Sequence, residues 1–252
     1  MELVIDIGNT MAKLAVFESN DIVLRSITPN DDLYSLEEIL RNHDIGLSIV
    51  STVAGIKGKT GEQLKQAKLP TILLDETTVA GYDNRYGVPP SMGSDRLAAI
   101  VEARATHPGH NILVIDNGSC ITYEFISESG KYLGGNISPG IQMRLNAMHT
   151  GTALLPAVNA DGETPEIGYD TETAMRTGCI TGTNYEVEGY IRHTTKRYPN
   201  LITIISGGAT TSIDTTETEV VFDHDLVIKG LRRILLETTA NGTLPGSTNH
   251  KR

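Results

Sequence analysis

The sequence predicts an α/β protein made of two related halves, each with a mixed β-sheet flanked by helices. The first observation is an apolar run at residues 3–10 that ends in an aspartate and a glycine-containing turn. The second is the same order of residue types at residues 112–119. The third is that each copy precedes a segment typical of a hairpin's return strand, at 13–17 and 121–126. The repeat therefore indicates a duplicated domain.

In the first half, apolar spacing and turn residues predict alternating elements. Gly8 and Asn9 tolerate the positive φ of a tight turn, so they are expected to join the first two strands. An aspartate, Asp31 or Asp32, is expected to cap the helix that follows the third strand. The strands are expected at 2–7, 12–17, 22–27, 47–53 and 71–74, and the helices at 33–40, at 61–67 and from about 93.

The second half continues in the same manner. Asp170 is expected to cap a helix over 171–179, and a longer amphipathic helix follows to about residue 197. Residues 154–168 are punctuated by Pro and Gly and predict a surface loop, while residues 75–93 form a long irregular segment of the kind that is often functional. The remaining strands are expected at 111–115, 121–126, 132–137, 201–205 and 220–222, and the remaining helices at 141–148 and 226–235.

The length and composition favour a globular protein of two domains. The 252 residues are enough for two cores, and the repeat places the domains at 1–110 and 111–252. A net charge of -10 argues against binding nucleic acid or an anionic membrane, because both need a basic surface. With only Cys120 and Cys179, no leader and no membrane-length apolar run, we expect a cytoplasmic protein. The seven histidines lack metal-ligand spacing, so we expect no zinc site.

Two aspartates, Asp6 and Asp116, occupy equivalent places in the repeat. A carboxylate at the end of a buried strand, followed by a glycine, suits the binding of a phosphate and its cation. If the halves pack with pseudo-symmetry, the two carboxylates meet across one cleft, where a cation would relieve their repulsion. The alternative is that each aspartate only bonds its own turn.

A third carboxylate, Asp95, lies in the motif at residues 93–96. It can act as a base for a substrate hydroxyl, with Arg96 as a clamp for a substrate carboxylate. Helix capping with a local ion pair is the simpler alternative. Tyr86 could hydrogen-bond the same substrate or be an ordinary loop tyrosine, and the Ser-Gly-Gly segment at 206–208 could admit a nucleotide or form only a turn.

Taken together, the motifs at 6–10, 93–96, 116–119, 134–140 and 206–208 resemble the type III pantothenate kinases in order and spacing over nearly the whole chain. That family belongs to the acetate-kinase, sugar-kinase, Hsp70 and actin superfamily, in which two ribonuclease-H-like domains bind ATP. The resemblance implies ATP-dependent phosphorylation of the primary hydroxyl of pantothenate, the first step of coenzyme A biosynthesis. It also implies a homodimer.

The resemblance further assigns roles to individual residues. Asp116 would bind a monovalent cation, K⁺ or NH₄⁺, and Ser119 would contact the ATP phosphates. Asp6 would lie near Mg²⁺, and Asp95 would accept the hydroxyl proton. The first phosphate loop would consist of Asp6, Ile7, Gly8, Asn9, Thr10, Met11, Ala12 and Lys13. Pantothenate would be bound by Tyr86, Gly93, Ser94, Asp95, Arg96 and Thr171.

One departure concerns the second phosphate loop, which commonly reads Asp-x-Gly-Thr-Ala and here reads Asp-Asn-Gly-Ser-Cys at residues 116–120. Ser119 preserves the hydroxyl, so activity is expected to survive. Two alternatives remain at this point: a non-catalytic nucleotide-binding regulatory protein of the same fold, and a kinase for another small hydroxy acid.

Overall fold

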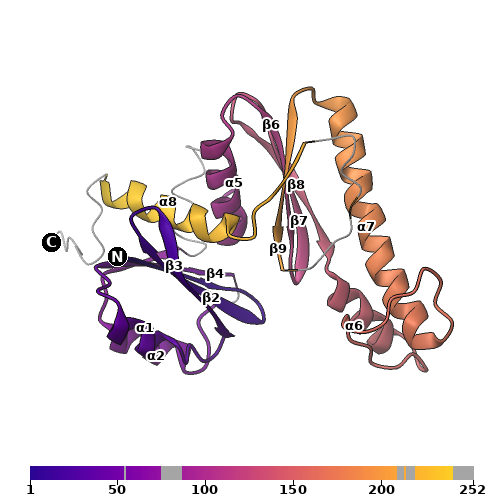
Figure 1. The fold of residues 1–252 in the computed structure, drawn as a ribbon, viewed down its shortest axis with the longest axis horizontal. Coiled ribbons are helices and arrows are strands. Elements are labelled where there is room, and N and C mark those ends of the chain that lie inside the picture. Colours follow the sequence, from indigo (N-terminus) through magenta and orange to yellow (C-terminus); the bar gives the residue numbers. More distant parts are fainter. Residues whose placement is uncertain (54, 75–86, 209–212, 214–218, 241–252) are drawn as a thin grey trace. The chain divides into compact units, whose positions relative to one another are not determined.

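The computed structural model describes residues 1–53, 55–74, 87–208, 213 and 219–240. The chain divides into two units, drawn in Figure 1. The first unit contains Met1–Ala105 and the segment that begins at Asp225, and the second contains Thr106–His224. This division differs from the expected domains 1–110 and 111–252, because the last helix belongs to the first unit. An amphipathic pattern shows that a helix packs on a sheet but not on which one.

The first unit is built on a five-stranded mixed sheet in the order β3-β2-β1-β4-β5. β1 is antiparallel to β2 and parallel to β4. β3 continues the antiparallel part and β5 the parallel part. The central strand β1 is apolar on both faces because both are covered. The strands are β1 (Glu2–Ile7), β2 (Met11–Glu18), β3 (Asp21–Pro29), β4 (Leu47–Thr52) and β5 (Thr71–Leu74).

Helices cover both faces of this sheet, with α1 and α2 on one side and α5 and α8 on the other (Figure 1). Under α1 and α2, the core takes alternate residues of β1, namely Leu3, Ile5 and Ile7. α8 packs against β1 and β4. It also meets α5 so closely that a Cβ on Gly230 would lie 1.9 Å from the Ala98 carbonyl oxygen. The helices are α1 (Leu36–Asn42), α2 (Thr60–Ala67), α5 (Ser94–Thr106) and α8 (Leu226–Ala240).

The second unit repeats this sheet. Its order is β10-β9-β6-β7-β8, with β6 antiparallel to β7 and parallel to β9, as β1 is to β2 and β4. The register repeats too, since Asp6 lies opposite Ser51 and Asp116 lies opposite Ser206. The expected duplication is therefore confirmed in the topology of the sheets. The strands are β6 (Asn111–Asn117), β7 (Cys120–Ile126), β8 (Tyr132–Pro139), β9 (Leu201–Gly207) and β10 (Val220–Phe222).

Two helices complete the second unit, α6 (Ile141–Gly151) and α7 (Thr171–Arg197). α7 lies along the sheet in Figure 1, where Val187 and Ile191 pack on Leu113 and Ile115. It is one helix of 27 residues, whereas the sequence predicted two. The start of α7 packs with α6, around Leu145, so buried contacts support it on both sides of the expected break. Among the described residues, no helix is both long and apolar enough to cross a membrane.

Neither aspartate expected to cap α1 does so. The N-cap is Ser35, and its side chain makes a 2.8 Å hydrogen bond with the Ser26 hydroxyl instead of capping the helix. Asp32 accepts hydrogen bonds of 2.8 Å from Lys59 and from Gln63. These contacts hold the pKa of Asp32 below its ordinary value. The aspartate therefore ties the segment before α1 to the start of α2.

Candidate functional site

The turn between β1 and β2 is held from outside by one side chain. The Gly8 N–H donates to the Met11 carbonyl at 3.0 Å. The side-chain amide of Asn30 donates to the carbonyls of Gly8 and Asn9 at 3.0 and 2.7 Å. Asn9 and Thr10 themselves are exposed. Sequence reasoning missed Asn30, because its contacts with the turn join segments that no local pattern relates.

Asp6 and Lys13 are direct neighbours across the β1–β2 pair. Both are half-buried, and cross-strand partners project from the same face of a sheet. Ser51 is the partner of Asp6 on the other side, in β4. A carboxylate and an ammonium group therefore come together at the carboxyl end of β1. This combination suits a phosphate accompanied by a cation.

The equivalent turn in the second unit is held by a neighbouring glycine. The Gly118 N–H donates to the Cys120 carbonyl at 3.0 Å, as Gly8 does in the first unit. The Gly140 N–H donates to the Ser119 carbonyl at 3.2 Å. A Cβ on Gly140 would lie 2.4 Å from the Gly118 carbonyl oxygen, so only glycine fits there. The Ser119 side chain is exposed and available to a ligand.

The end of β9 lies very close to the end of β6. Gly207 has a φ of 97°, and a Cβ there would lie 2.3 Å from the Asn117 carbonyl oxygen. Close approach of the two backbones therefore requires glycine at position 207. The Asn117 side chain is 1% exposed, and neither of its amide atoms has a hydrogen-bond partner among the described residues.

The start of α5 is anchored at the carboxyl end of β4. The hydroxyls of Ser94 and Ser51 lie 2.8 Å apart, and both residues are buried. Because Ser51 is the cross-strand neighbour of Asp6, this contact brings the motif at 93–96 to the carboxyl end of β1, beside the turn between β1 and β2. A Cβ on Gly93 would lie 2.6 Å from Oδ1 of Asp95, so the glycine leaves room for that carboxylate.

Asp95 is half-buried in the first turn of α5. Burial raises the pKa of its carboxyl, because it disfavours the charged form. The Arg96 N–H donates to Oδ1 at 2.8 Å, and this bond and the Arg96 charge offset only part of that effect on the pKa. A carboxylate with a raised pKa is a stronger proton acceptor than an exposed aspartate.

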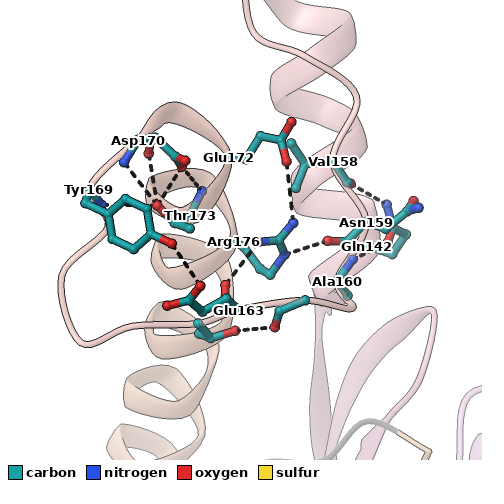
Figure 2. Close-up of polar contacts among 12 residues, drawn as sticks. Gln142, Val158, Asn159, Ala160, Glu163, Tyr169, Asp170, Glu172, Thr173 and Arg176 are labelled. Atoms are coloured by element: carbon teal, nitrogen blue, oxygen red, sulfur yellow. Dashed lines mark hydrogen bonds and ion pairs between the residues drawn. The ribbon is translucent and has the colours of Figure 1, made fainter.

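Thr171 is the first residue of α7 and is exposed. Its position is fixed by the capping box that the sequence predicted at Asp170. Oδ1 of Asp170 accepts the Thr173 N–H at 2.8 Å, and the Asp170 N–H donates to the Thr173 hydroxyl at 3.1 Å (Figure 2). The bond from the Thr173 N–H lowers the pKa of Asp170.

The loop before α7 is organised around one buried arginine. Nε of Arg176 donates to the Asn159 carbonyl and one terminal nitrogen donates to the Glu163 carbonyl, both at 3.0 Å (Figure 2). Gly162, with a φ of 132°, lies where a Cβ would be 2.9 Å from the guanidinium carbon. Sequence reasoning described this segment only as a surface loop and missed Arg176.

The expected site residues fall into two groups. The first unit holds residues 6–13 and 93–96, and the second holds Asp116, Ser119 and Thr171. Tyr86 lies outside the described residues. Within the described part of the chain, no three His, Cys, Asp or Glu side chains gather as a metal site.

Comparison with known proteins decides the family. The model of the type III pantothenate kinase family matches residues 2–193. The chain belongs to the type III pantothenate kinases. The family member from Bacteroides fragilis is 45% identical over 93% of this chain and 97% of its own length. The one from Phocaeicola vulgatus is 42% identical over 93% of this chain and 98% of its own length.

The fold of the kinase is that of the acetate kinases and actin-like ATPases. The crystal structure of Porphyromonas gingivalis acetate kinase superposes with a TM-score of 0.51, covering 94% of this chain and 99% of that chain. At 10% identity this similarity concerns the fold alone. It agrees with the repeated five-stranded sheets of the kinase.

Proposed function

We propose that this kinase transfers the terminal phosphate of ATP to the primary hydroxyl of pantothenate, giving 4'-phosphopantothenate, the first step of coenzyme A biosynthesis. Membership of the family supports the reaction. The observation that carries the assignment to residues is the 2.8 Å contact between the Ser51 and Ser94 hydroxyls. This contact holds the segment that carries Asp95 at the strand end where Asp6 lies. The proposed proton acceptor, Asp95, therefore lies near the proposed phosphate turn between β1 and β2.

Asp95 accepts the proton of the attacking hydroxyl in this proposal. Its half-buried position and raised pKa suit the role. Phosphoryl transfer depends mainly on positioning and charge neutralisation, and general-base assistance contributes about 10²–10⁴-fold. Arg96, beside Asp95, has the planar fork that binds a carboxylate, and pantothenate carries one.

The remaining substrate residues are assigned by the family resemblance. Gly93 and Ser94 line the pocket beside Asp95. Thr171 is also assigned to pantothenate, and the capping box holds its backbone at the start of α7. Tyr86 is assigned to the same pocket.

The two phosphate turns hold ATP in this proposal, through residues 6–13 and Ser119. Asp6 is placed near Mg²⁺, and Asp116 binds K⁺ or NH₄⁺. Their carboxylate oxygens fit hard cations, and phosphate oxygens and water complete the coordination of such ions where the protein supplies few ligands. When bound, Mg²⁺ supplies neutralisation of phosphate charge. Lys13, the cross-strand neighbour of Asp6, adds positive charge at the turn.

We also propose a cytoplasmic homodimer. In the second unit, large apolar side chains are strongly exposed in the loop before α7: Leu154 at 93%, Ile167 at 81% and Tyr169 at 68%. Exposed apolar groups of this kind favour a protein partner. Light scattering of the purified chain is expected to give twice the mass of 27.2 kDa, and a monomer would contradict the dimer.

A coupled ADP-release assay tests the reaction. We expect ADP release that requires pantothenate and is faster in potassium buffer than in sodium buffer. Nucleotide binding without any ADP release would favour a regulatory protein. ADP release with other hydroxy acids but not with pantothenate would favour a different substrate. Equal rates in both buffers would remove the monovalent cation from the proposal.

A further inference from the structure

Arg144 of α6 makes three polar contacts that its position in the sequence does not suggest. Its Nε donates to the Pro139 carbonyl at 2.8 Å, and its Nη2 donates to the Ser138 hydroxyl at 2.8 Å. The same Nη2 pairs with the carboxylate of Glu186, in α7. Arg144 therefore joins α7 to the end of β8, at the junction between β8 and α6 (Ser138–Gly140).

The Glu186 carboxylate is itself anchored in the core. The Tyr123 hydroxyl donates to it at 2.8 Å, and the Tyr123 ring is fully buried and stacked on Tyr190 with centroids 3.9 Å apart. Burial acts to raise the pKa of Glu186, but hydrogen bonds from Arg144, Ser138 and Tyr123 lower it overall. Burial and the neighbouring carboxylate raise the pKa of Tyr123, which keeps its hydroxyl as a donor.

The β8–α6 junction that Arg144 contacts lies directly against the second phosphate turn, at residues 118–120. Gly140, the residue after Pro139, donates its N–H to the Ser119 carbonyl at 3.2 Å. Gly140 is buried and has no spare room, since even a Cβ would collide with the carbonyls of Gly118 and Ser119. A shift of the β8–α6 junction at Ser138–Gly140 is therefore transmitted to the backbone that presents Ser119.

We propose that Arg144 and Glu186 are positioning residues that hold the second phosphate turn in its nucleotide-binding form. They act through the β8–α6 junction at Ser138–Gly140 and contact neither ATP nor pantothenate. The effect on nucleotide affinity rests on the proposed function, because that function assigns the ATP phosphates to Ser119. The effect on the backbone at 118–120 does not rest on it.

Hydrogen exchange of the ligand-free protein tests the backbone effect. In Arg144→Gln, peptides covering 117–122 are expected to exchange about tenfold faster than in the wild type, because a charge-assisted contact is lost. Arg144→Lys keeps the charge but loses the fork, so it should restore protection only in part. Arg41→Gln is the matched control, since Arg41 makes an exposed 2.8 Å pair with Glu37 in α1.

Nucleotide binding and kinetics test the consequence. For Arg144→Gln and Glu186→Gln, the Kd for a non-hydrolysable ATP analogue and the KM for ATP should each rise about tenfold, with kcat and the KM for pantothenate nearly unchanged. Urea unfolding of each variant separates this effect from a general loss of stability. A merely structural pair would lower kcat and raise both KM values together, or leave all three unchanged.

The outcomes distinguish the two proposals. Hydrogen exchange at 117–122 that is unchanged in both Arg144→Gln and Glu186→Gln would overturn the positioning role, whatever the activity of these variants. Faster exchange in a protein that does not phosphorylate pantothenate would overturn the proposed function and leave the positioning role standing. Faster exchange with an unchanged Kd for the analogue would overturn the link from this turn to the nucleotide.

Discussion

Ser51 and Ser94 share a hydrogen bond of 2.8 Å between their hydroxyls, at the carboxyl end of β4 and the start of α5. Ser51 is 0% exposed and Ser94 is 2% exposed, so water cannot replace the contact. It joins a strand residue beside Asp6 to the residue before Asp95. The bond therefore fixes the helix that carries the proposed base relative to the turn between β1 and β2.

Ser51→Ala is expected to weaken both stability and catalysis. The substitution removes the partner of a buried hydroxyl and should lower the free energy of unfolding by about 1 kcal/mol. Because α5 then shifts relative to the phosphate turn, kcat/KM for pantothenate should fall about tenfold. Urea unfolding and steady-state kinetics measure the two effects.

The control is Ser48→Ala, at the other end of β4. Ser48 is also buried and its hydroxyl lies 2.6 Å from that of Thr71. It should show a similar loss of stability with normal kinetics. Equal kinetic losses in both variants would mean that Ser51 has no special link to the site.

Asp95→Asn tests the proton acceptor. Asparagine keeps an oxygen that can accept the Arg96 N–H but cannot take a proton, so kcat should fall about 10²–10⁴-fold while ATP still binds. The coupled assay and calorimetry with an ATP analogue provide the two readouts. Near-normal turnover would remove Asp95 from this role.

The difference in stability between Asp95→Asn and the wild type should depend on pH. The folded-state pKa of Asp95 is raised, so the folded state favours the protonated form. Its contribution to stability is complete below the unfolded-state pKa and is lost as pH rises through the folded-state pKa. Asp95→Asn lacks this loss and should gain stability relative to the wild type as pH rises above the unfolded-state pKa of about 4. Urea unfolding at each pH measures the difference in the free energy of unfolding between the variant and the wild type. A difference that does not change with pH would refute a raised pKa of Asp95 in the folded state.

Asn117→Val is expected to raise the free energy of unfolding by about 1 kcal/mol, since it removes a buried amide that lacks partners among the described residues. Ile7 occupies the equivalent position in β1, which shows that an apolar residue suits this place in the sheet. Thermal unfolding measures the change. A clear loss of stability would show that the amide is satisfied, for example by an internal water.

Much of the fold could be read from local patterns. The hairpin of β1 and β2 followed from an apolar run with a Gly-Asn turn, and the start of α7 followed from the capping residue Asp170. The order of the sheet strands was not local information. The strand order is shown only by the structure, in which the pairing of Asp6 with Ser51 is repeated by that of Asp116 with Ser206.

The supporting contacts of the site could not be predicted, because each joins segments distant in the chain. Asn30, which follows β3, holds the turn between β1 and β2. Ser51 and Ser94 lie 43 residues apart in the chain. Arg144 and Glu186 meet only when α6 packs on α7. Residue types and spacing therefore predict the candidate reactive groups. The residues that position those groups depend on tertiary packing, which the sequence does not show directly.

Gly230 also bears on the order in which the protein forms during its synthesis. It lets α8 lie directly on the backbone of α5 and cover β1 and β4, yet α8 is made after the whole of Thr106–His224. During synthesis on the ribosome, one face of the first sheet therefore stays incompletely covered until α8 is made. The second unit is continuous in the chain, so it can finish folding before that. The unit that is translated first is in this sense the one that is completed last.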